Sequence, residues 1–169
     1  MISTTMATAL NEQIKWEMYS ANLYLAMSAY LQDAGLTGFS HCIRLQYEEE
    51  TPHALKDYDF LLSRGGQVTM LSIDAPDANW SNILEIFEET LSHEQEVTRR
   101  INELVHLAKE ERYFATDIFL QWFVTEQVEE EETVKDIISK LRMIKGEGQG
   151  MLVLDKDMSA RTFTPPPAN

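Results

Sequence analysis

Four long segments of the chain repeat apolar residues with the period of an α-helix, and this pattern limits the possible folds more than any other feature. The segments span about residues 5–33, 38–63, 81–109 and 113–145. Within each one, apolar side chains recur every three or four residues and so share one face of a helix. Long helices bury such faces against one another. The sequence therefore predicts an all-α four-helix bundle.

The connections predict how these helices are ordered. A short turn at Gly35 makes the first two helices antiparallel neighbours, with Thr37 as the expected N-cap of the second. The roughly sixteen residues after Arg64 lack a helical period and can extend over roughly 50 Å, more than the roughly 39 Å of the second helix. Such a crossover lets the second and third helices run parallel. The expected bundle is up-down-down-up.

Other sequence signals mark the start of the third helix and the segment that follows the fourth. Ser81 is the expected N-cap of the third helix. After a glycine-rich hinge, residues 150–159 could form a short amphipathic fifth helix, whose apolar side needs a partner. Residues 1–161 are thus expected to form a single domain, followed by a loose proline-rich tail at 162–169.

Composition excludes several classes of function. The formal net charge is −14, which opposes nucleic-acid and anionic-membrane surfaces and favours cations. No run of eighteen apolar residues and no signal-peptide pattern occurs, so a cytoplasmic location is expected. Cys42 is the single cysteine and cannot form an internal disulfide.

Polar residues interrupt the inward apolar rows near the middle of all four helices. Each occupies a row that also carries apolar residues at seven-residue spacing, as with Glu17 and Tyr24 between Leu10 and Leu31. The polar members are Glu17, Tyr24, Gln46, Glu50, His53, Asp57, Glu94, Gln127 and Glu130. Four buried carboxylates, from Glu17, Glu50, Glu94 and Glu130, would repel one another unless they were protonated or neutralised. Two divalent ions would balance them, which predicts a dinuclear metal site with His53 as a nitrogen ligand. A metal-free polar network, or a misjudged register, remains the alternative.

The motif Glu-x-x-His occurs twice, and the helix face separates the two copies. Glu50 and His53 lie on inward rows. Glu103 falls nine residues after Glu94, on the opposite side of the third helix, so Glu103 and His106 are expected at the surface. His41 and His93 lack a carboxylate partner on a core row and are expected to be ordinary, partly exposed histidines.

Further acidic residues flank the predicted site. Glu49, Glu126 and Glu129 could hold a third, looser cation, whereas Glu131 and Glu132 are expected on a solvated face. Pro52 lies between the two ligands of the second helix and lacks the N–H that would bond to Glu48. A kink or a widened turn is expected there.

Together these features resemble the ferritin family, over nearly the whole chain. The matching motifs are a Glu on the first helix, Glu-x-x-His on the second, Glu on the third and Gln-x-x-Glu on the fourth, as in bacterial non-haem members. They fall on Glu17, Glu50, His53, Glu94, Gln127 and Glu130, with the family's tyrosine at Tyr24. The resemblance implies a third iron position at Glu49, Glu126, Glu129 and Glu130. The ligand types suit iron, although manganese, cobalt or zinc could occupy the same site.

The resemblance also implies an activity and an assembly. It implies a ferroxidase that oxidises Fe(II) with O2 or H2O2 at two iron ions per subunit and stores ferric oxide in a 24-subunit shell. Glu17, Glu50 and His53 would hold one iron, Glu50 would bridge, and Glu94 and Glu130 would hold the second. Gln127 would bond near the oxidant, and Tyr24 would donate a hydrogen bond or an electron.

Differences between this sequence and related families limit the cofactors and reactions that are expected. Gln127 and Glu130 stand where haem-binding bacterioferritins carry a second Glu-x-x-His, and Thr51 stands where they carry a haem-ligating Met, so no haem is expected. One cysteine cannot build the CxxC module of rubrerythrin-like peroxidases. The alternative function is a di-iron oxidase or peroxidase that stores no mineral. Asp117 is the residue expected at an iron-entry channel.

Overall fold

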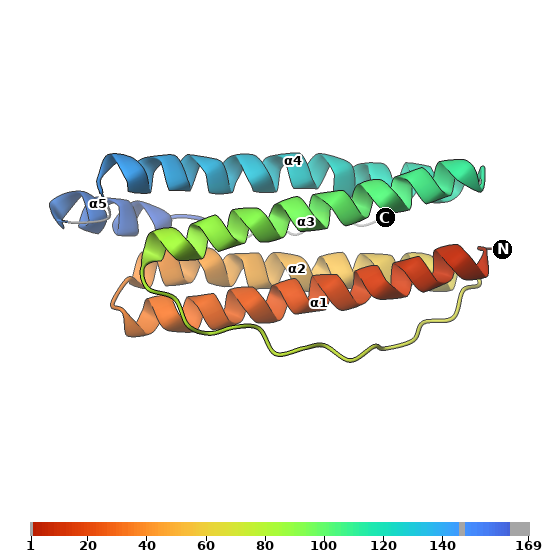
Figure 1. Cartoon of the computed structure of the whole chain (residues 1–169), viewed down its shortest axis with the longest axis horizontal. Helices are drawn as coiled ribbons and strands as arrows, with labels where there is room; N and C mark the ends of the chain where they lie inside the picture. Colours follow the sequence, from red (N-terminus) through yellow and green to blue (C-terminus); the bar gives the residue numbers. More distant parts are fainter. Residues whose placement is uncertain (1, 146–147, 163–169) are drawn as a thin grey trace.

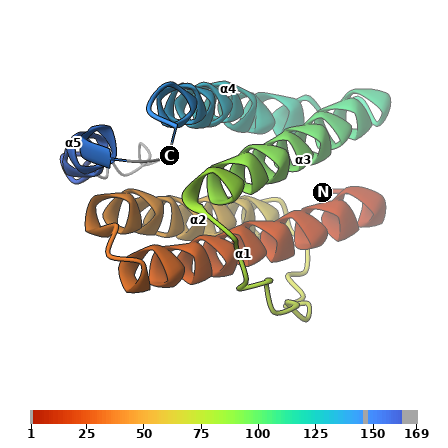
Figure 2. The same ribbon diagram turned by 60° about the vertical axis from the view of Figure 1, so that its left-hand side comes forward.

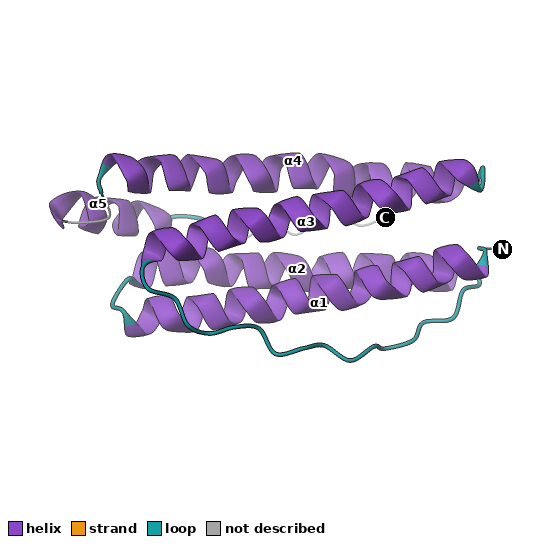
Figure 3. Ribbon diagram, in the orientation of Figure 1, coloured by secondary structure: helices purple, strands orange, loops and turns teal. Residues whose placement is uncertain are grey.

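The computed structural model describes residues 2–145 and 148–162, which form five α-helices (Figure 1). They are α1 (Thr4–Asp33), α2 (Thr37–Ser63), α3 (Ile83–Glu110), α4 (Phe114–Met143) and α5 (Gly148–Met158). Every remaining stretch of these described residues is loop or turn (Figure 3). The all-α prediction is therefore confirmed, and the predicted helix ends differ from the observed ones by at most two residues.

The first four helices form an up-down-down-up bundle. α1 and α2 are antiparallel, as are α3 and α4, and the connection from α2 to α3 runs along the whole bundle so that these two helices point the same way (Figure 1). α5 lies at one end of the bundle, beside α2 (Figure 2). The predicted topology and the crossover are thus confirmed.

Two side chains hold the crossover against the bundle. Asn11 of α1 donates from Nδ2 to the carbonyl of Gln67 (3.0 Å) and accepts from the amide of Thr69 at Oδ1 (2.7 Å). At the other end, Trp80 is buried against Tyr30, with ring centroids 5.5 Å apart. The crossover is therefore fixed near both of its ends, although it has no helix of its own.

The helix caps differ in part from the predictions. Asn82, not Ser81, caps α3, and its Oδ1 accepts from the amide of Glu85 (3.0 Å). The Glu85 carboxylate in turn accepts from the amide of Ser81 (2.6 Å). These two bonds select Asn82 as the cap, and the helix begins at Ile83. Thr37 is the first residue of α2, and the cap position falls on Leu36, which makes no side-chain cap bond.

Pro52 does not interrupt α2. The helix is α-helical from Thr37 to Ser63 with Pro52 inside it, so no widened turn is present, and the expected kink stays a prediction. The neighbouring Thr51 hydroxyl donates to the carbonyl of Tyr47 (3.2 Å), a bond to the preceding turn. The metal-ligand candidates on both sides of Pro52 therefore share one continuous helix.

The apolar core is divided into two clusters. One contains Tyr24, Phe39, Phe87 and Val134, and the other contains Leu10, Leu61, Ile101 and Phe123, each with their neighbours. In every one of the four long helices, the predicted polar residues other than Tyr24 fall between a member of one cluster and a member of the other. A buried polar band therefore crosses the middle of the bundle.

Candidate metal centre

Six of the predicted site residues lie in the polar band and come from all four long helices. Their exposed fractions are 1% for Glu17, 3% for Glu50, 3% for His53, 0% for Glu94, 4% for Gln127 and 6% for Glu130. All six were placed on inward rows by the sequence, and the structure buries all six. Because each side chain stands on a helix with packed apolar turns on both sides, the helices and not loops set its position.

Three of these residues form a compact group. One ligand atom from each of Glu17, Glu50 and His53 lies within 4.8 Å of the others, and no other set of three such residues in the described part of the chain is grouped in this way. His53 Nδ1 lies 3.5 Å from Glu50 Oε2. Gln13 donates from Nε2 to Glu17 Oε1 (2.6 Å), while Glu17 Oε2 is buried without a partner. Two carboxylates and an imidazole at this spacing can hold one divalent cation.

Glu94 lies among hydrogen-bond donors. The Tyr24 hydroxyl donates to Glu94 Oε1, and Gln127 donates from Nε2 to Glu94 Oε2 (3.0 Å). The sequence grouped these three residues in one site, and the structure brings them into contact. Burial raises the pKa of the Glu94 carboxyl, whereas the bonds from Tyr24 and Gln127 lower it.

Glu130 has a partner that the sequence analysis did not use. Gln46 donates from Nε2 to Glu130 Oε2 (2.6 Å), and Gln46 Oε1 is buried without a partner. Gln46 stood on an inward row of α2, which was the available signal for its role. Burial, and next the carboxylate of Glu94, raise the pKa of Glu130 to about 7.

The carboxyl groups of the band resist ionisation together. Burial is the largest cause that raises the pKa of Glu17 and that of Glu50 well above the ordinary value. The next cause is a neighbouring carboxylate, Glu50 for Glu17 and Glu94 for Glu50. These carboxylates therefore need protons or cations to balance their charge. The Glu17 oxygen that has no hydrogen-bond partner is available as a ligand for such a cation.

Asp57 is a buried carboxylate to which the sequence assigned no role. Both of its oxygens are buried without a hydrogen-bond partner, one turn beyond His53 on α2. Burial raises the pKa of Asp57, and the carboxylate of Glu17 raises it further. Its position on the row of Glu50 was the signal that could have found it.

Replacement of Asp57 by Asn should stabilise the iron-free protein at pH 8, because it removes a charge that the folded state cannot solvate. The expected gain in the free energy of unfolding is about 1–3 kcal/mol. It should vanish toward pH 3, below the ordinary aspartate pKa of 3.8, where the carboxyl group is mostly protonated in both states. Urea unfolding at the two pH values measures it, with the exposed Asp59→Asn as the matched control. A loss of stability at pH 8 would contradict the prediction.

The flanking acidic residues are less buried. Glu49 and Glu126 are half-buried, and Glu129 is exposed. Burial raises the pKa of Glu49 to about 7; Arg161 lowers it, and Glu130 and Glu126 raise it. The structure therefore places Glu49 in the electrostatic field of these other acids. The Glu49 carboxylate itself is bonded to Arg161.

The other predicted surface groups lie where expected. Glu103 and His106 are both exposed, and Glu103 pairs with Arg99. His41 is exposed, and His93 is half-buried beside Tyr24 with ring centroids 5.9 Å apart. The second Glu-x-x-His is thus an outward-facing pair, as the choice of helix face predicted.

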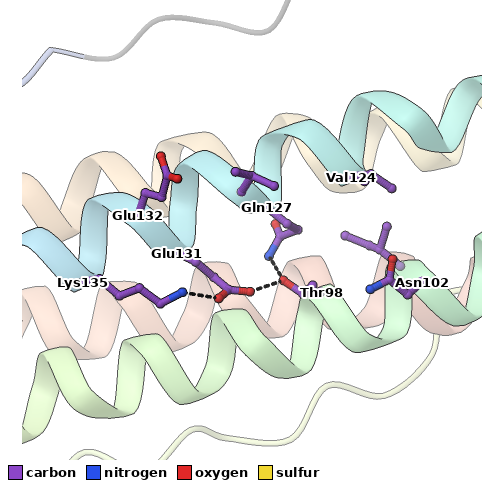
Figure 4. Close-up of a pocket in the computed structure, with 9 residues that line it drawn as sticks. Thr98, Asn102, Val124, Gln127, Glu131, Glu132 and Lys135 are labelled. Carbon is purple, nitrogen blue, oxygen red and sulfur yellow. Dashed lines mark hydrogen bonds and ion pairs between the residues drawn. The ribbon is translucent and has the colours of Figure 1, made fainter.

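A pocket of about 300 Å³ between α3 and α4 reaches the polar band. Figure 4 shows Thr98, Gln127, Glu131 and Lys135 along its wall. Thr98 accepts from Gln127 Nε2 (3.4 Å) and donates to Glu131 Oε1 (2.8 Å), which Lys135 also binds at its other oxygen (2.8 Å). A chain of hydrogen bonds therefore connects the pocket surface with Glu94. Asp117, the residue expected at a channel, is half-buried and accepts from Gln121.

Among the described helices, none is both long enough and apolar enough to cross a membrane.

The sequence and the fold match known proteins along nearly the whole chain. The profile of the ferritin-like domain matches residues 7–144. A bacterial non-heme ferritin of Staphylococcus aureus is 37% identical over 163 residues, which cover 96% of this chain and 98% of that protein. One of Bacteroides fragilis is 39% identical over 161 residues, which cover 95% of this chain and 100% of that protein. The solved open pore ferritin from Archaeoglobus fulgidus is 48% identical, with a TM-score of 0.94 over 96% of this chain and 100% of that one. This chain therefore belongs to the ferritin family.

Proposed function

We propose that this protein stores iron and is a ferroxidase, which oxidises Fe(II) at the polar band of each subunit and deposits ferric oxide inside a hollow 24-subunit shell. The observation that carries the proposal is the buried group of Glu17, Glu50 and His53, with a carboxylate oxygen of Glu17 left without a partner. The ferritin relatives support storage and the shell. The charge and the ligand types favour Fe(II) as the substrate. We expect the protein to lie in the cytoplasm and to bind no haem.

Each residue of the band has a distinct proposed task. Glu17, Glu50 and His53 bind the first Fe(II), Glu50 bridges, and Glu94 with Glu130 binds the second. Each ion gives up one electron, so the pair supplies the two electrons that reduce O2 to H2O2, or H2O2 to water. Because carboxyl groups with raised pKa hold protons before the cations arrive, Fe(II) binding releases protons.

Tyr24 and Gln127 act on the second half of the centre. Burial raises the pKa of Tyr24 well above its usual value, so its hydroxyl stays protonated and keeps its bond to Glu94. Gln127 orients the same carboxylate from α4 and lies beside the oxidant. Tyr24 also supplies a residue from which an electron could be taken. Glu49, Glu126 and Glu129, with Glu130, form the proposed third iron position.

Two measurements test this function together. Iron-free protein is given Fe(II) in small steps in air, and ferric absorbance is followed beside a protein-free control. The same sample is then sized by analytical ultracentrifugation and imaged by electron microscopy. We expect oxidation much faster than the control and a hollow particle of 24 subunits with a dense core. Fast oxidation by a monomer or dimer would support the non-storing di-iron oxidase instead, and no acceleration would exclude both.

A further inference from the structure

The chain after α5 folds back onto α2. Asp155 of α5 accepts at Oδ1 from the amides of Gly38 (2.9 Å) and Phe39 (3.0 Å), and thus caps the start of α2. The backbone of Asp155 approaches Gly38 so closely that an added Cβ would lie 1.6 Å from its carbonyl oxygen. Only glycine permits this contact. The end of α5 is therefore held against α2, which determines where the following residues can reach (Figure 2).

Arg161 is the residue that this path brings to the candidate centre. Its Nη2 donates to Glu49 Oε2 (2.7 Å), and its Nη1 lies 3.7 Å from Cys42 Sγ. Its backbone carbonyl accepts from His41 Nε2 (3.1 Å). The exposed fractions of the side chains are 25% for Arg161 and 15% for Glu49. Three positions along α2 thus contact one arginine that is 112 residues from Glu49 in sequence.

The charge of Arg161 acts on two parts of the acidic region. It lowers the pKa of Glu49, which Glu130 and Glu126 raise, and it also lowers the pKa of Glu130. The guanidinium therefore balances negative charge at the edge of the polar band. A metal ion bound to Glu49 would neutralise the same carboxylate, so the metal ion and the guanidinium compete for it.

We propose that Arg161 is the resident cation of the third carboxylate cluster, Glu49, Glu126, Glu129 and Glu130, and decides whether that cluster takes up a metal ion. While the guanidinium is bonded to Glu49, it holds the oxygen that a metal would need. A metal ion binds there when Arg161 swings away. This inference rests on the proposed function but concerns only the third position.

The structure offers Arg161 room and alternative partners. A pocket of about 580 Å³ adjoins it, with Glu132, Asp136 and Asp157 in its wall. Residues 161 and 162 belong to no helix, so no backbone hydrogen-bond ladder must break for the side chain to move. Both side chains of the Arg161–Glu49 ion pair stay partly exposed, so water screens the pair and weakens it relative to a fully buried one. A divalent ion can therefore displace it at modest cost.

Zinc titration of the iron-free full-length protein tests the inference without any oxidation step. Isothermal calorimetry would compare the wild type with Arg161→Gln, Arg161→Lys and the control Arg142→Gln, whose guanidinium pairs with the distant Glu88. We expect two tight Zn²⁺ ions per subunit in every protein. A third, weaker ion should bind about tenfold more tightly in Arg161→Gln, because it no longer competes with the guanidinium for Glu49 and is no longer repelled by that charge. Arg161→Lys should stay near the wild type.

Each remaining outcome overturns the inference. An unchanged third affinity in Arg161→Gln, no third ion in any protein, or the same gain in Arg142→Gln would each do so. An equal gain in Arg161→Lys would also overturn it, since loss of docking and not loss of charge would then be the cause. If the wild type failed to bind the two tight ions, the proposed dinuclear centre itself would be wrong. The two failures are therefore distinguishable.

Discussion

Replacement of Glu50 by Gln is expected to slow Fe(II) oxidation by about 100-fold or more, while the corresponding Glu103→Gln leaves the rate unchanged. Loss of a residue that only hydrogen-bonds to a metal ligand already lowers metal affinity or activity by about 10–100-fold. Glu50 is proposed to bind both irons directly, so its loss should cost more. Both residues begin a Glu-x-x-His motif, yet Glu50 is 3% exposed and grouped with Glu17 and His53, whereas Glu103 lies on the outer face of α3. Initial rates of ferric absorbance in air measure the effect.

The matched pair makes the experiment decisive. Gln has nearly the shape of Glu, so Glu50→Gln should fold and assemble, which sedimentation and thermal unfolding will show. Zinc calorimetry should show the loss of tight binding in Glu50→Gln and its retention in Glu103→Gln. Equal rates in the two variants would refute the choice made by helix face. A rate loss in Glu103→Gln alone would place the metal centre on the other side of α3.

Iron-free protein is expected to be less stable at pH 8 than at pH 5, the reverse of the usual behaviour of paired carboxylates. The pKa of Glu130 is raised from 4.5 to about 7, so between these values the folded state binds more protons than the unfolded state. Stability is then complete below pH 4.5 and is lost as the pH rises through 7. At about 1.4 kcal/mol per pKa unit, a shift of this size corresponds to a loss on the order of 3 kcal/mol, shared between Glu130 and the Glu94 carboxylate that helps to raise it.

Denaturant unfolding at fixed protein concentration, with a chelator present, measures this trend at pH 5 and pH 8. A Glu130→Gln variant should flatten it. Zn²⁺ at pH 8 should restore stability, because a cation favours the charged carboxylates that the bare centre disfavours. Stability that rises from pH 5 to pH 8 without metal would show that internal cations, and not protons, balance the band in the metal-free protein.

Much of the candidate centre could be read from helical periodicity. Seven-residue rows predicted that Glu17, Glu94 and Gln127 point inward, because seven residues make almost two full helical turns and return to the same face. The same rule separated Glu50 from Glu103. Asn82 shows its limit, since Ser81 and Asn82 are both good caps and only the reciprocal bonds with Glu85 select between them.

Partners from different helices were less predictable. Gln46 and Asp57 were found on inward rows, but a row does not tell which side chain faces which. Gln46 bonds to Glu130 across 84 residues, whereas neither carboxylate oxygen of Asp57 has a hydrogen-bond partner. Those outcomes depend on the relative rotation and depth of packed helices, which no single segment encodes.

The sequence by itself determined the four helices, the crossover and the band of polar residues at their middle, because these depend on local spacing along each helix. The tertiary structure alone decided which donors surround Glu94 and that Arg161 lies on Glu49. The latter contact requires α5 to pack beside α2, with Asp155 capping α2 at Gly38. A contact that spans 112 residues is set by this packing, whereas helical spacing acts only over a few turns.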